Sequence, residues 1–196
     1  MPNWTFNTIT VRGDKESLNK MMADAERNEQ GGLNLSSWFP VPETFNKYDT
    51  TNHPDGEGLK VGEEWWDGLG RHDGVVTEEL IQEFKDATRE QREKYGVVGW
   101  YDYNHKMYGC KWNSELVVES ESDTQIVLTA DTPWSAPDAW LMRMSEKYPD
   151  LVFENHAEYE EGFWEDTVYE DGDGDQVGTG EMDWGDDDEE EQEETE

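Results

Sequence analysis

The sequence has one cysteine, few basic residues and no long apolar run. A lone cysteine, Cys110, excludes an intramolecular disulfide and a zinc site built from several cysteines. No apolar run approaches the roughly 20 residues that a membrane-spanning helix needs. A secretory signal has a basic stretch followed by an apolar one, and the opening Met-Pro-Asn-Trp-Thr-Phe lacks this pattern. We therefore expect a cytoplasmic protein.

Positive charge is also scarce, since 15 Lys and Arg face 49 Asp and Glu, for a net charge of -34. Every Lys and Arg lies at or before Lys147, so the chain from Glu154 onward has many Asp and Glu but no Lys or Arg. A protein that binds a nucleic acid backbone needs several Lys or Arg to displace counterions, so direct nucleic-acid binding is excluded. Such a field instead attracts basic protein surfaces.

Aromatic residues are plentiful, at 12% of the chain with ten Trp, and disordered chains are poor in them. A folded part is therefore expected despite the charge. The terminal run from Gly185 to Glu196 has nine acids and no apolar residue. We predict one domain over 1–172 and an acidic disordered tail over 173–196, which could also serve solubility alone.

Local patterns predict the elements of the domain. Residues 43–76 are Gly-rich and polar and predict an irregular segment, and the aromatic residues 100–113 predict turns. An antiparallel sheet with helices on one face accommodates the rest, so we predict an α+β fold of ferredoxin-like type with an insertion at about 43–113. The expected strands are 3–12, 114–121, 124–131, 151–159 and 163–170, and the expected helices are 14–28, 78–95 and one that opens at Pro137.

Five short motifs follow one another along the chain. They are Pro2-Asn3-Trp4 with Asn7, Ile9 and Gly13; residues 38–42; Gly99-Trp100-Tyr101 with residues 109–113; Thr129-Ala130 with residues 133–137; and residues 148–151 with Tyr159-Glu160. In this order they resemble the Api-like family of bacteriophages, prophages and plasmids, which has a ferredoxin-like C-terminal domain. The resemblance spans about residues 2–165 and implies a mobile-element origin, without a known activity. This sequence departs from the pattern at Cys110, at Asp131-Thr132 and in the acidic extension after Tyr169.

Catalytic and metal-binding patterns are weak. Cys110 follows His105 by five residues, but no third orienting group is indicated, so a buried structural thiol is the expectation. Asp171, Asp173 and Asp175 match the start of a calcium loop, yet Gln176 stands where its glycine belongs. We expect no enzyme activity and no cofactor.

The leading hypothesis is a protein of a phage or mobile element that binds and inhibits a basic nucleic-acid-handling host protein, such as a defence nuclease. Strand carboxylates would stand in for phosphates, because same-face residues lie about 6.6–7 Å apart along a strand. Adjacent Trp65 and Trp66 in a polar insertion are a second candidate contact, as an interface anchor or as a loop folded back onto the domain. The alternative is a nonenzymatic binding or assembly module. The candidate carboxylates are Glu154, Glu158, Glu160, Glu161, Glu165, Asp166, Glu170 and Asp171.

Overall fold

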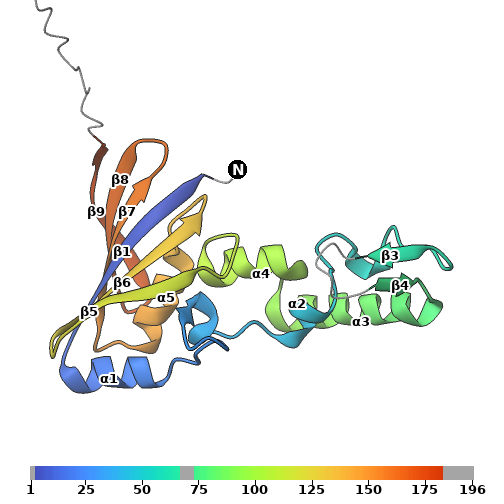
Figure 1. Ribbon diagram of the computed structural model, residues 1–196, viewed down its shortest axis with the longest axis horizontal. Helices are drawn as coiled ribbons and strands as arrows, with labels where there is room; N and C mark the ends of the chain where they lie inside the picture. Colours follow the sequence, from blue (N-terminus) through green and yellow to red (C-terminus); the bar gives the residue numbers. More distant parts are fainter. Residues whose placement is uncertain (1–2, 67–72, 183–196) are drawn as a thin grey trace, which may run out of the picture.

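A seven-stranded antiparallel sheet dominates the computed structural model, which describes residues 3–66 and 73–182, with the backbone alone at residues 66 and 73 (Figure 1). The strand order is β2-β5-β6-β1-β7-β8-β9. The predicted class, an antiparallel sheet with helices, is confirmed. The strands are β1 (Trp4–Arg12), β2 (Leu33–Asn34), β5 (Glu115–Glu121), β6 (Gln125–Pro133), β7 (Val152–Tyr159), β8 (Phe163–Glu170) and β9 (Asp173–Glu181).

The central strand β1 is paired along its whole length with β6 on one side and along most of it with β7 on the other. Its side chains alternate, so that Ile9 and Val11 are fully buried while Phe6 and Thr8 are exposed. Trp4, Phe6, Thr8 and Thr10 share one face, as the alternation predicts, and that face is the one turned away from the core.

Two helices cover the apolar face of the sheet. Helix α1 (Lys15–Ala23) begins at Asp14, whose carboxylate accepts hydrogen bonds from the Glu16 and Ser17 amides. It ends at Ala23, earlier than the predicted residue 28. Helix α5 (Asp138–Lys147) buries Trp140, Leu141 and Met144 on one side. Together with the inward residues of β1, β6 and β7, these side chains form one hydrophobic core.

A second lobe extends from the sheet, and it corrects the prediction of an irregular segment over 43–76 (Figure 1). Helix α3 (Glu78–Tyr95) has the predicted bounds, because Thr77 caps its first turn by accepting a hydrogen bond from the Leu80 amide. Tyr48, Trp65, Val76, Phe84 and Ala87 form a separate hydrophobic cluster beside α3. The other elements of the lobe are α2 (Glu43–Lys47), the 3-10 turn η2 (Pro54–Gly56), β3 (Glu64–Trp66) and β4 (Asp73–Val75); a further 3-10 turn, η1 (Leu35–Ser37), precedes the lobe.

Helix α4 (Gly99–Tyr108) joins the two lobes, where the sequence predicts turns. Tyr108 is buried in the core beneath the sheet, and Tyr103 lies 4.3 Å from Phe45 of the second lobe, ring centre to ring centre. Because aromatic residues are mediocre helix formers, this helix depends on its packing against both lobes.

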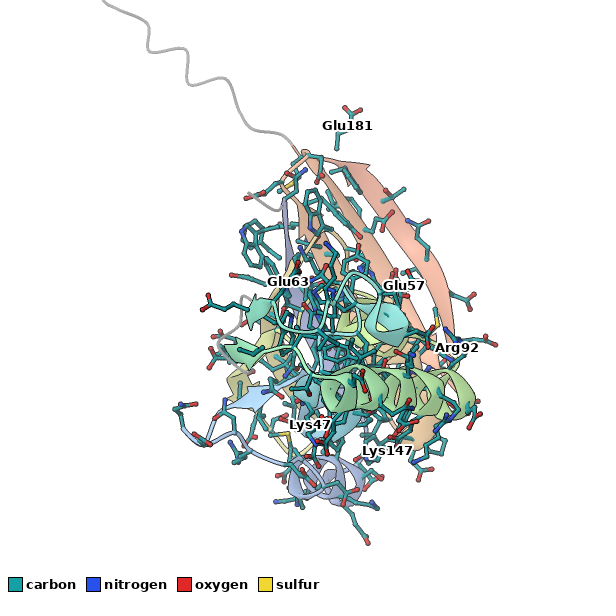
Figure 2. The ribbon with its side chains drawn as sticks, turned by 90° about the vertical axis from the view of Figure 1, so that its right-hand side faces the viewer. Lys47, Glu57, Glu63, Arg92, Lys147 and Glu181 are labelled. Atoms are coloured by element: carbon teal, nitrogen blue, oxygen red, sulfur yellow. The ribbon has the colours of Figure 1, made fainter. Side chains whose placement is uncertain are left out.

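The prediction of a disordered tail from residue 173 is wrong at its start, since residues 173–181 form β9, which pairs with β8 along its length. Glu181 projects from the end of β9, away from the rest of the ribbon (Figure 2). The predicted tail beyond residue 182 lies outside the described residues. Over the described ranges, no helix has both the length and the apolar character to cross a membrane.

Candidate partner-binding face

The side of the sheet opposite α1 and α5 has no helix over it in the part of the chain that the structure describes (Figure 1). We call this side the open face. Across β1 and β6 to β9, strand register places seven carboxylates on it and one guanidinium, that of Arg12. Its residues include Phe6, Thr8, Thr10 and Arg12 on β1; Thr129 and Asp131 on β6; Glu154, His156 and Glu158 on β7; Trp164, Asp166, Val168 and Glu170 on β8; and Asp173 and Asp175 on β9.

Four of the eight predicted carboxylates, Glu154, Glu158, Asp166 and Glu170, lie on the open face. The other four do not. Glu165 points to the helix side, where it accepts hydrogen bonds from Tyr159 and Gln176.

The remaining three predicted carboxylates lie at the ends of the strands. Glu160 and Glu161 lie between β7 and β8, and their carboxylates accept hydrogen bonds from the Trp4 amide and the Asn3 side chain. Asp171 occupies the β8–β9 turn with a positive φ of 51°. Sequence alone predicts strands here, but not which alternate residues face the solvent.

The spacing expected for phosphate mimicry is absent along β7. Same-face neighbours on a strand lie about 6.6–7 Å apart, and His156 occupies the position between Glu154 and Glu158. The Cα atoms of Glu154 and Glu158 are therefore about 13 Å apart along the strand, and Glu154 is also paired with Arg12 at 3.0 Å. The open face is acidic, without the regular charge ladder of a nucleic acid strand.

His156 sits between two carboxylates at the middle of the open face. Its Nδ1 lies 2.7 Å from Oδ1 of Asp166, and its Nε2 lies 3.4 Å from Oε1 of Glu158. Partial burial on its own lowers the pKa of His156, but the hydrogen bonds and charges of the two carboxylates outweigh it, so the pKa is raised above the ordinary 6.5. The protonated ring holds both side chains in place.

Trp164 provides an aromatic surface beside these carboxylates, and the sequence hypothesis missed it. A Cβ built on Gly180 would lie 2.8 Å from each of three indole atoms, Cε2, Cζ2 and Nε1, so the ring turns one face toward that glycine. Gly178 is similarly close, at 3.1 Å from Cζ3. The His156 ring lies 5.7 Å away at 36°. The alternation of Trp164, Asp166 and Val168 along β8 was the available signal.

The candidate anchor Trp65 lies on β3 and is only 8% exposed. Its ring packs edge-on against Phe84, with centroids 5.4 Å apart. This burial does not favour Trp65 as an interface anchor, and it matches the alternative, a segment folded back onto the protein. Trp66 follows on β3, and its side chain is outside the described residues.

The weak catalytic and metal-binding motifs of the sequence do not come together as a site in the described residues. Cys110 is fully buried, its thiol donates to the Trp112 carbonyl at 3.3 Å, and burial raises its pKa to about 12. Asp173 and Asp175 lie on a β-strand instead of a calcium loop. Among the described residues, no group of three or more His, Cys, Asp or Glu is arranged to hold a metal.

No protein-family model matches this chain, and no curated protein matches it in sequence. A solved structure of similar shape is the crystal structure of a protein api92 from Yersinia pseudotuberculosis, of family-model DUF1281. It is 12% identical, with a TM-score of 0.47, and the match covers 94% of this chain and 99% of that one. The similarity is one of overall shape and says nothing about activity.

Proposed function

We propose that this protein binds a basic protein surface through the open face of its sheet. The observation that carries the proposal is the charge of that uncovered face, where seven carboxylates of β6 to β9 accompany a single guanidinium, on Arg12. A surface of this sign repels phosphate backbones and accelerates encounters with cationic proteins.

The dimensions of the open face suit a protein partner. Strands β6 to β9 span about 19 Å at a spacing of about 4.8 Å, and strands of eight or nine residues are about 27 Å long. An area of that order is what each partner contributes to a standard-sized interface. Exposed Phe6 and the Trp164 ring add the aromatic surface that the centres of interfaces favour.

The role that we propose for this binding is inhibition of a nucleic-acid-handling host protein, such as a defence nuclease, because such proteins present basic grooves to DNA or RNA. The origin in a phage or other mobile element rests on the Api-like sequence motifs. We also propose a ferredoxin-like unit built of β1, α1, β5, β6, α5 and β7, and the strand order β5-β6-β1-β7 supports it.

The test is a pull-down from host lysate treated with nuclease, at about 50 mM and about 500 mM salt, read by mass spectrometry. The expected result is one basic nucleic-acid-binding protein that is lost at the higher salt, because screening weakens charge pairs at the surface. The recovered protein is then assayed for DNA binding and cleavage with and without this protein, and both should fall.

A matched pair of variants tests whether the captured protein binds to the open face. Reversing Glu154, Glu158, Asp166 and Glu170 to Lys should abolish capture. Capture should persist when four exposed acids elsewhere are reversed, since the net charge is the same. These are Glu29 and, on the second lobe, Glu57, Glu63 and Glu93, of which Glu57 and Glu63 are labelled in Figure 2. Equal loss with both variants, or capture that ignores salt, would contradict the proposal.

The alternative, an assembly module that docks through Trp65 and Trp66, is less favoured because Trp65 is buried against Phe84. A neutral partner that is retained after reversal of the open-face acids would favour it.

A further inference from the structure

Around Trp164, the open face combines carboxylates with aromatic rings, which is a more specific arrangement than negative charge alone. Strand register aligns Phe6 of β1, Glu158 of β7 and Trp164 of β8 in one row across the sheet. Phe6 is 43% exposed. Directly opposed residues on adjacent strands have Cβ atoms about 4.5–5.5 Å apart, so Glu158 lies between two aromatic residues in this row.

The indole ring of Trp164 has one face against the sheet and one face turned outward. Gly178 and Gly180 have no side chains, and this allows the ring to lie across β9 at close range. The other face of the ring points away from these glycines, on the side where the described residues place no helix.

Carboxylate oxygens remain available beside that ring. His156 contacts Oδ1 of Asp166 and Oε1 of Glu158, and no described residue hydrogen-bonds to Oδ2 of Asp166 or Oε2 of Glu158. Asp166 and Trp164 are same-face neighbours on β8, about 6.6–7 Å apart. A guanidinium group can stack on an aromatic ring and donate hydrogen bonds to neighbouring carboxylates, so this arrangement suits a guanidinium ligand.

We propose that Trp164, with Glu158 and Asp166, receives an arginine side chain of the partner protein, the guanidinium stacking on the indole while its N–H groups donate to the two carboxylates. The inference rests on the proposed function, since it specifies the chemistry of the same face. Lysine fits less well, because its ammonium is a compact, strongly hydrated point charge that cannot stack.

The test compares two peptides of equal length and charge, nona-arginine and nona-lysine, as ligands of the full chain at about 50 mM salt. Binding is measured by titration calorimetry, and the Trp164 indole N–H resonance is followed by NMR. We expect nona-arginine to bind more tightly and to shift that resonance. The variant Trp164→Leu should weaken nona-arginine binding about three- to tenfold, the worth of one cation–π contact, and change nona-lysine binding less than about twofold.

Two further variants guard against a folding artefact. Trp164→Tyr keeps an aromatic face and should retain most of the preference for arginine. Val75→Ala removes an exposed apolar side chain from β4, on the second lobe and off the open face, and should change neither affinity.

The possible failures are distinguishable. Equal binding of both peptides, with no effect of Trp164→Leu, would overturn the arginine site and leave the proposed function standing. Binding of neither peptide, or binding that is unchanged after Glu154, Glu158, Asp166 and Glu170 are reversed to Lys, would overturn both.

Discussion

Nδ1 of His156 lies 2.7 Å from Oδ1 of Asp166, across the hydrogen-bonded pair of strands β7 and β8. The contact makes one histidine the positive centre of a negatively charged surface. Protonation of His156 therefore sets how strongly the neighbouring carboxylates repel each other.

The first prediction concerns the pH dependence of stability. The pKa of His156 is raised in the folded state, so its protonation stabilises the fold fully below the unfolded value of 6.5, and this contribution is lost as pH rises through the folded pKa. His156 is partly exposed, which limits the effect to about 0.5–1 kcal/mol. Urea unfolding of the wild type and His156→Gln should differ by this amount at pH 5.5 and converge by about pH 9.

An NMR titration provides the control for this prediction. Asp166→Asn removes the closer carboxylate, so the pKa of His156 should fall toward its ordinary value. An unchanged titration curve would show that the pair does not govern the protonation of His156.

The second prediction tests the close packing of Trp164 on β9. Gly180→Ala places a Cβ 2.8 Å from the indole ring, so either the ring or the strand must move. We expect a loss of about 1–3 kcal/mol in the free energy of unfolding. Val177→Ala, on the same strand at a residue that is 65% exposed, should change stability by less than about 0.5 kcal/mol. Equal stability of Gly180→Ala and wild type would contradict the packing described for Trp164.

The third prediction separates the two cores. Phe84 is fully buried between Tyr48 and Trp65, at centroid distances of 5.3 and 5.4 Å. Phe84→Ala should cost about 3–5 kcal/mol. Because the core beneath the sheet shares none of these side chains, hydrogen exchange should accelerate in α3 while β1 and β6 stay protected. Val75→Ala, at an exposed residue of β4, is the control, and uniform loss of protection would mean one cooperative unit.

The fourth prediction concerns the only thiol. Cys110 is fully buried, and its raised pKa leaves almost no thiolate at pH 8. The native protein should resist a disulfide reagent such as dithiobis-nitrobenzoate for hours, and one thiol per chain should react at once in 6 M guanidinium chloride. Rapid modification of the native protein would rule out the buried position.

The elements that the sequence predicts well have strong local signals. Helix α3 has a capping threonine and an apolar stripe, and strands β1, β6, β7 and β8 alternate or are rich in β-branched and aromatic residues. These signals are local in the chain, so they can be recognised without knowledge of the fold.

The elements that it misses depend on distant partners. Strand β9 is rich in Gly and Asp, which resemble turn residues, and it is held by its pairing with β8 and by the Trp164 ring above its glycines. Helix α4 has no side-chain cap and is stabilised by two lobes at once. For the candidate site, residue types pointed to the acidic strands, and alternation along β8 puts Trp164 and Asp166 on one face and Glu165 on the other. Which of the two faces is turned to the solvent is a property of the assembled sheet.

Strand β9 forms one border of the sheet, with β8 as its only hydrogen-bonded neighbour among the described residues. A second molecule can add a strand of its own to such an exposed edge strand. Its charged side chains, Asp173, Asp175 and Glu181, are all acidic, so two molecules approaching border to border repel each other at neutral pH. The same acidity that attracts basic proteins therefore keeps the protein from polymerising with itself, and concentrated samples should stay clear at low salt and turn turbid when acidified toward pH 4.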